Sequence, residues 1–195
     1  MQAIQDVELA CKFAERGCKY VGARVNLIEH IHECPFDPKV ECQFWNCKVM
    51  VSMEKMVNHL KESHKHLEIS RDGKATMSYT KNKSIGNFFP TICHSKGDTF
   101  FIHAATEQDN WMLWVVLLGT KEDAQNYEII MTVKDDLGLP LLEFTGKVFS
   151  IDKKKENIVL EEGVLHLDKE FAEIVASNNA DGKLVLKVYY DIISK

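Results

Sequence analysis

The first 64 residues contain two segments of the same design: residues 11–34 read CKFAERGCKYVGARVNLIEHIHEC, and residues 42–64 read CQFWNCKVMVSMEKMVNHLKESH. Each segment begins with two cysteines, leaves eleven residues after the second one, and then supplies a histidine with a fourth Cys or His close behind. The same frame therefore occurs twice in succession. Its eight members are Cys11, Cys18, His30, Cys34, Cys42, Cys47, His59 and His64.

A tetrahedral zinc ion explains this spacing, because such an ion takes four Cys or His donors, two from a knuckle and two from a helix or its end. Residues four apart on a helix share a face, so His30 and Cys34 can converge on one ion. His59 and His64 are five apart, which requires a helix that loosens at its end. Ser52 is positioned to cap that second helix. The apolar helix positions are Leu27, Ile28 and Ile31 in the first unit, and Met53, Met56, Val57 and Leu60 in the second.

The sequence therefore predicts two structural Zn²⁺ ions, each closed by four protein donors, with no position left for a reacting water. Disulfide bonds explain the pattern less well, because five clustered cysteines leave one unpaired and no export signal is visible. His32 and His66 compete with His30 and His64 as ligands, although each departs from the shared spacing. We expect metal removal to unfold units this small.

The composition changes near residue 67, after which short β-rich runs alternate with Gly, Asn and Asp. We predict tandem zinc fingers over residues 1–66, a connector over 67–74 and a mostly antiparallel β-sandwich over 75–195. Short helices are expected at residues 120–125 and 168–177, and the mixed charges of residues 152–156 predict a solvated loop. The predicted strands cover residues 75–80, 88–94, 98–106, 111–118, 127–134, 141–148, 164–167 and 183–192.

Several function classes fit this composition poorly. The net charge is −5, and residues 1–66 hold nine Lys or Arg against nine Asp or Glu, so no basic surface for nucleic acid is predicted. The longest apolar run covers residues 111–118, far short of the roughly 20 residues that cross a bilayer. Cys93 and His94 are neighbours on a predicted strand and point to opposite faces, so they do not form a nucleophile–base pair.

Residues 11–18 and the ligand order that follows resemble the zinc finger pair of the seven-in-absentia (SIAH) proteins. Residues 118–127, LGTKEDAQNY, are similar to a signature of that family between sandwich strands. The resemblance implies a TRAF-like β-sandwich that dimerises and recruits substrates for a RING-type ubiquitin ligase. It also implies action in ubiquitin-dependent protein degradation. A cytoplasmic location is expected, with the nucleus as an additional one.

The chain departs from that family because only ten residues precede Cys11, where a RING with eight ligands would stand. We therefore expect a substrate-recognition and dimerisation module that is not catalytic alone, and that meets a ubiquitin-conjugating enzyme only if a RING exists elsewhere. One alternative is a RING-less regulator that pairs with full-length ligases. An alternative from another class is a zinc-finger nucleic-acid binder.

Peptide recognition is expected at an exposed sheet edge, where an extended segment can add as one more strand. The resemblance implies an extended, proline-containing degron peptide, and residues 75–80 are the equivalent edge. Met77 and Tyr79 share one face of that strand, and Phe88 or Phe89 stands where the family tends to place a tryptophan. Burial of Met77 and Phe89 in the core is the competing interpretation.

Overall fold

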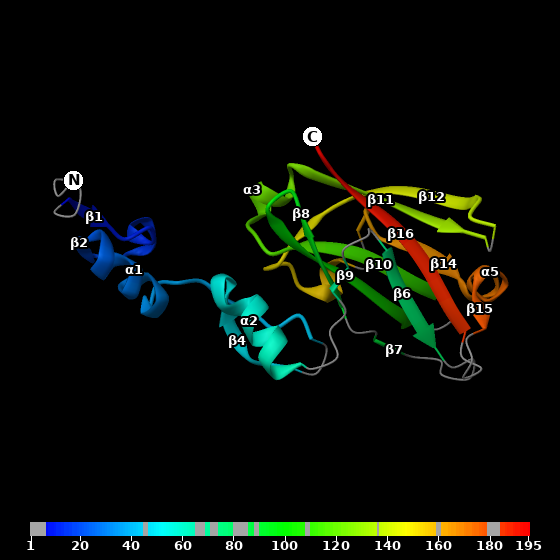
Figure 1. The fold of residues 1–195 in the computed structure, drawn as a ribbon, viewed down its shortest axis with the longest axis horizontal. Coiled ribbons are helices and arrows are strands. Elements are labelled where there is room, and N and C mark those ends of the chain that lie inside the picture. Colours follow the sequence, from blue (N-terminus) through cyan, green and yellow to red (C-terminus); the bar gives the residue numbers. More distant parts are fainter. Residues whose placement is uncertain are drawn as a thin grey trace.

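The computed structural model describes residues 7–44, 47–64, 69–70, 74–79, 86–87, 90–107, 110–135, 137–158, 161–178 and 184–195. Figure 1 shows three parts in chain order. The first finger lies at one end of the molecule, the second finger follows it, and a β-rich body forms the other end.

The first finger is a small hairpin followed by a helix. Strand β1 (Glu8–Ala10) pairs antiparallel with β2 (Val21–Ala23), and α1 (Arg24–Glu33) follows directly. Between the strands lies the short 3-10 helix η1 (Ala14–Arg16), which ends at Gly17 with φ of 102°. Glycine adopts this left-handed conformation without the steric cost of a Cβ, so the chain can turn sharply just before Cys18.

The second finger repeats this plan with β3 (Lys39–Glu41), β4 (Met50–Ser52) and α2 (Met53–Ser63). Ser52 stands at the N-cap position with extended backbone angles, as predicted, but its side chain makes no capping hydrogen bond. Met56 and Leu60 are fully buried, four residues apart on one face of α2.

The described strands of the β-rich body form two sheets. The first has the strand order β13-β10-β9-β8-β5, with β14 also pairing to β10 and β7 to β9. Its pairs are antiparallel except β10–β13 and β5–β8. The strands are β5 (Ile69–Ser70), β7 (Gly86–Asn87), β8 (Thr91–Ser95), β9 (Asp98–Glu107), β10 (Asn110–Leu117), β13 (Phe149–Ser150) and β14 (Leu165–Asp168).

The second sheet is antiparallel throughout and has the order β12-β11-β16-β15, with β6 pairing to β16. Among the described strands, β6 pairs with β16 alone and so forms an edge of this sheet. The strands are β6 (Lys74–Tyr79), β11 (Tyr127–Lys134), β12 (Pro140–Lys147), β15 (Ser177–Asn178) and β16 (Leu184–Ser194).

The strand β10 is buried on both of its faces, because alternate residues of a strand point in opposite directions. Trp111, Leu113, Val115 and Leu117 pack into the core between the two sheets, against side chains of β11 and β16 such as Met131 and Leu186. Met112, Trp114 and Val116 belong to a second core on the outer face of the first sheet.

That second core is shared with the second finger. Met56 and Leu60 of α2, together with Val40 and Val51 of the β3–β4 hairpin, form one cluster with Trp114 and its neighbours on the sheet. The second finger is therefore seated on the sandwich by apolar packing, and burial of this kind is the dominant stabilising contribution between packed elements.

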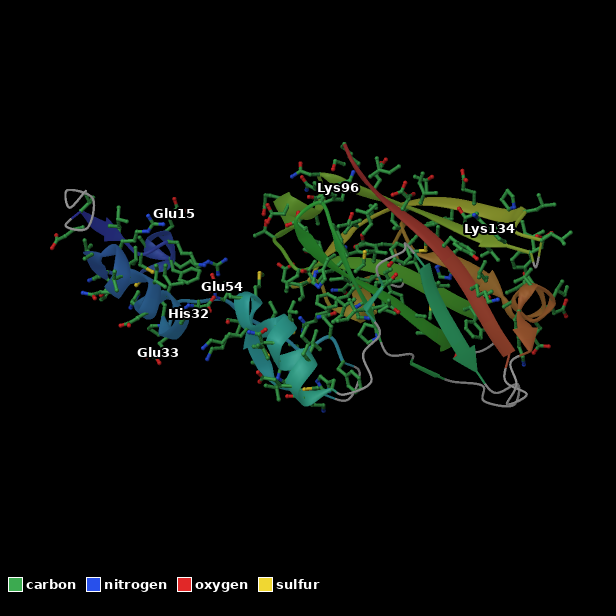
Figure 2. All side chains as sticks on the ribbon, viewed as in Figure 1. Glu15, His32, Glu33, Glu54, Lys96 and Lys134 are labelled. Carbon is green, nitrogen blue, oxygen red and sulfur yellow. The ribbon has the colours of Figure 1, made fainter. Side chains whose placement is uncertain are left out.

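The first finger has its own small core and a polar link to the second. Leu27 packs with the three cysteines of the first finger. This cluster is contacted by Phe13, Tyr20 and Ile31. Between the fingers, the Lys12 ammonium donates to the Glu54 carboxylate, and His32 Nδ1 lies 4.0 Å from the other Glu54 oxygen. Figure 2 shows Glu54 and His32 near each other at this junction.

Short helices complete the described part of the body. In α3 (Lys121–Ala124), Thr120 accepts from the Asp123 backbone N–H, and the Asp123 carboxylate accepts from the Thr120 backbone N–H. In α5 (Lys169–Val175), the Asp168 carboxylate accepts from the Phe171 backbone N–H. Between them in the chain lies α4 (Lys155–Ile158).

The structure confirms the predicted fold class, a zinc-binding finger pair followed by a mostly antiparallel β-rich body with few helices. Two local interpretations were wrong, the second only in part. Ile28 is 51% exposed and does not join the first finger's core. The predicted solvated loop over residues 152–156 is exposed at Asp152 and Lys154, as expected, but its last two residues belong to α4, and Lys153 donates to Glu161.

The described part of the predicted connector includes Ile69 and Ser70, which form β5 and pair with β8. None of the helices in the described ranges has the length and apolar character that crossing a bilayer requires.

Candidate metal centres

The structure brings the first four predicted ligands into one group. The donor atoms of Cys11, Cys18, His30 and Cys34 all lie within 4.8 Å of one another. The Cys34 and Cys18 Sγ atoms are 3.6 Å apart, and the Cys11 and Cys34 Sγ atoms 3.9 Å. A tetrahedral zinc ion with Zn–S bonds of about 2.3 Å separates two sulfurs by about 3.8 Å. The thiols are therefore spaced as a zinc ion requires.

The second group joins Cys42, Cys47, His59 and His64 under the same 4.8 Å limit. Cys42 Sγ lies 3.4 Å from His64 Nε2, and Cys47 Sγ lies 3.5 Å from His59 Nε2. Tetrahedral bond lengths place a sulfur and a nitrogen about 3.5 Å apart on one zinc ion. Both distances match that value.

Helix ends supply the last two donors of each group. His30 lies on α1 and Cys34 is its C-cap residue, with extended backbone angles. His59 lies on α2, and His64 follows as the C-cap with φ of −129° and ψ of 86°, outside helical geometry. The additional residue between the second pair is thus accommodated where α2 ends, as its spacing predicted.

A backbone N–H donates a hydrogen bond to the first cysteine of each group. The Phe13 N–H donates to Cys11 Sγ and the Phe44 N–H donates to Cys42 Sγ, each over 3.5 Å. A sulfur that accepts a hydrogen bond is favoured as a thiolate, which is the form that binds a metal. The two fingers therefore share a hydrogen-bonding pattern as well as a ligand order.

An aromatic ring covers one histidine in each group. Tyr20 stacks on His30 with ring centroids 3.9 Å apart, and Phe44 stacks on His64 at 4.0 Å. Ser63 Oγ lies 3.3 Å from His59 Nδ1, the ring nitrogen that does not face the group. Such contacts orient a ligating imidazole. The sequence did not reveal these three supporting residues, because aromatic and serine residues near a zinc ligand are common and have no fixed spacing.

The surroundings of the two groups shift the pKa of several of their members. Burial raises the pKa of Cys42 to about 12 and also raises the pKa of Cys34. The pKa of Cys18 is lowered, mainly by a hydrogen bond from the Tyr20 backbone. Burial lowers the pKa of His64, and the charge of His59 lowers it further. A divalent cation that binds here must displace thiol protons, so its binding becomes stronger as the pH rises.

Each group can hold one zinc ion. All six cysteines lie in the described ranges and form no disulfide, so the clustered thiols remain available as donors. Four protein donors complete a tetrahedral ion, and soft thiolate with imidazole is the donor set that zinc prefers in structural sites. The ion would supply folding free energy to each finger rather than an open position for chemistry.

The competing histidines lie elsewhere. His32 has a side chain that is 57% exposed and faces Glu54, outside the first group. His66 lies outside the described residues. Cys93 is 6% exposed within the core between the sheets, where it packs as a small apolar residue.

The predicted peptide-binding residues are placed only in part. Met77 and Tyr79 belong to the edge strand β6, in register with Leu186 and Leu184 of β16. Phe88 and Phe89 lie outside the described residues.

Comparison with known proteins adds two findings. The zinc finger family described as "Sina, zinc finger" matches residues 2–79, the region that holds both groups. The chain is also 24% identical over 138 residues to the E3 ubiquitin-protein ligase SINAT4 of Arabidopsis thaliana. That alignment covers 66% of this chain and 42% of the plant protein, so the chain spans less than half of that ligase. In its ligand frame and its Sina-type finger region, the chain is similar to the seven-in-absentia (SIAH) proteins.

Proposed function

We propose that this chain is the zinc-stabilised substrate-recognition module of a SIAH-like ubiquitin ligase. The observation that carries the proposal is the joining of a Sina-type finger pair to a β-sandwich, with the second finger and the sandwich sharing one core. A finger seated in this way fixes its position relative to the sandwich, which suits a protein that presents bound partners in a defined orientation.

The module acts by binding and not by metal chemistry. All eight donors come from the protein, so both zinc ions are structural, with Cys11, Cys18, His30 and Cys34 holding one and Cys42, Cys47, His59 and His64 the other. Ubiquitin transfer requires a surface for a ubiquitin-conjugating enzyme, which a RING joined to this module would supply.

Substrate recognition is assigned to the edge strand β6. Its backbone N–H and C=O groups on the side away from β16 can pair with an extended peptide, as in strand addition. Met77 and Tyr79 are alternate residues of this strand and are proposed to contact alternate side chains of that peptide. Phe88 and Phe89 are proposed to supply apolar contact from the neighbouring segment.

We further propose that the chain divides into three functional parts. Residues 1–66 carry the fingers, 67–74 connect them and 75–195 bind substrate and dimerise. The partners are protein substrates or degron peptides, with a second copy or a full-length ligase as the dimer partner. The proposed location is the cytoplasm, with the nucleus as an additional one.

Peptide binding by the zinc-loaded chain tests the recognition edge. An array of extended, proline-containing peptides identifies binders, and fluorescence polarisation then compares the chain with Met77→Asp and Tyr79→Asp variants. We expect each substitution to weaken binding about tenfold or more, because a buried carboxylate would lose hydration without a partner. Lys96→Asp, at a surface loop, is the control. Equal affinity in all four proteins would contradict the assignment of the edge.

A second assay separates a ligase module from a regulator. The chain is added to a RING-bearing family member together with its substrate and a conjugating enzyme. A fall in substrate ubiquitination, reversed by excess substrate, supports a regulator that competes for substrates. Ubiquitination promoted by the chain when fused to that RING supports the ligase module.

A further inference from the structure

A cleft of about 690 Å³ lies where the second finger meets the outer face of the sandwich. One wall comes from the β3–β4 hairpin and the Cys42–Cys47 knuckle, and the other from β9, β10 and the segment that follows β13. Its size is that of sites that hold a drug-sized molecule or a few side chains of a partner. The described residues that line the cleft come from the second finger, from β9 and β10, and from residues 151–158.

The inner surface of the cleft is apolar and aromatic. Ile158 and Trp114 are 1% and 3% exposed, and they form its floor with Ile151. His103 stacks parallel to Trp114, with ring centroids 5.3 Å apart and an interplanar angle of 5°. Phe44 lines the cleft from the finger side. Flat rings on both walls favour an aromatic side chain as the group that enters.

The rim of the cleft is richer in cations than the chain as a whole. Three lysines and two carboxylates line it, in a protein whose net charge is −5. Of the lysines, Lys153 is paired with Glu161. Lys39 of the finger and Lys154 of the sandwich are exposed, and neither has an ion-pair partner among the described residues. One of the carboxylates, Asp152, accepts a hydrogen bond from Ser150 Oγ.

We propose that this cleft binds a short acidic segment of a partner protein, with one aromatic side chain inserted between the finger and the sandwich. Carboxylates on either side of the aromatic residue would reach Lys39 on one wall and Lys154 on the other. The occupant follows from charge complementarity at the rim and from the rings inside. This second site extends the proposed function, and it can fail without affecting recognition at β6.

The test uses defined probes on the zinc-loaded full chain. A fluorescein-labelled peptide Ser-Asp-Glu-Trp-Glu-Asp-Ser is compared with versions in which Lys replaces every acid or Ala replaces Trp. Anilinonaphthalene sulfonate, an aromatic anion, serves as a small-molecule probe of the same chemistry. Binding is followed by polarisation, and the contact site by the indole N–H resonance of Trp114.

We expect the acidic Trp peptide to bind, to shift the Trp114 resonance and to displace the dye. The Lys39→Glu/Lys154→Glu double variant should lose about tenfold or more in affinity, and added salt should weaken binding of the unmodified chain. Lys61→Glu/Lys96→Glu is the matched control, with one exposed lysine from the finger and one from the sandwich. It carries the same charge change and should bind as the unmodified chain does.

Three results would overturn the proposal. Equal affinity for the acidic and basic peptides would show that charge complementarity does not contribute to binding. An equal loss in both double variants would show a nonspecific charge effect. Dye binding without peptide binding up to about 1 mM would assign the cleft to small aromatic anions and not to a protein segment.

Discussion

Trp111 and Trp114 lie three residues apart on β10 and belong to two different hydrophobic cores. Trp111 packs between the two sheets, and Trp114 packs on the outer face beneath the second finger. The two faces of one strand thus pack into two cores, one between the sheets and one under the second zinc finger. Loss of the finger would expose Trp114 while leaving Trp111 covered.

Substitution of Leu60 tests the packing of the second finger on the sandwich most directly. It is fully buried in the core shared by α2 and the sheet. We expect Leu60→Ala to lower the free energy of unfolding by about 2–5 kcal/mol, because it removes buried methyl groups and leaves a cavity. Urea unfolding of the zinc-loaded protein measures the change. Ile28→Ala, at an exposed position of α1, should change stability by about 0.5 kcal/mol or less. A similar loss in both variants would contradict the shared core.

The first finger should depend on metal more strongly than the second. Apart from Leu27, the buried members of its core are its own three ligand cysteines, whereas the second finger also packs on the sandwich. We expect a chelator to abolish amide protection over residues 8–33 and to leave the core strands β10 and β11 protected. Hydrogen exchange with and without chelator measures this. Persistent protection of α1 without metal would contradict the prediction.

The capping box of α3 should contribute cooperatively. Thr120 and Asp123 each accept a hydrogen bond from the other's backbone N–H, and the Thr120 hydroxyl also donates to the Asp123 carboxylate. We expect Thr120→Ala to cost about 1 kcal/mol, because it leaves a helix-end N–H without its partner. A double-mutant cycle with Asp123→Ala tests the coupling. Strictly additive losses would show that the two side chains act independently.

Glu161 should give stability that depends on pH. Hydrogen bonds from Lys147 and Lys153 lower its pKa from 4.5 to about 2. Because the folded-state pKa lies below the unfolded one, the stabilisation is fully present above pH 4.5 and is lost as the pH falls toward 2. We expect Glu161→Gln to cost up to about 1 kcal/mol near pH 7 and clearly less near pH 2, where half of the folded-state carboxyl is protonated.

Thermal unfolding of the sandwich at several pH values measures this difference. The exposed neighbour Glu162 provides the control, because Glu162→Gln should leave the pH profile of stability unchanged. A constant gap between the Glu161→Gln variant and the unmodified protein from about pH 7 to about pH 2 would contradict the assigned ion pairs.

The zinc frame could be predicted from sequence because ligand spacing is a local property. The segments from Cys11 to Cys34 and from Cys42 to His64 each span fewer than 25 residues, and helix geometry fixes which donors converge. The strands β9, β10, β11 and β12 were also predicted to within two residues, because each is rich in apolar and β-branched residues and is bounded by turn residues.

Contacts between distant segments could not be predicted in the same way. The apolar run of β10 could not show that α2 would cover one of its faces. The parallel pairing of β5 with β8 and of β10 with β13 likewise cannot be recognised in the sequence of either strand alone. The cleft beside Lys39 and Lys154 depends on both kinds of contact, and it became visible only in the assembled structure.

The zinc content of the purified chain tests the central claim most directly. Native mass spectrometry should find two zinc ions per chain, and Cys11→Ala or Cys47→Ala should each remove one ion and leave the other bound. Fewer than two ions in the unmodified chain, with residues 8–64 still ordered by amide exchange, would contradict the account.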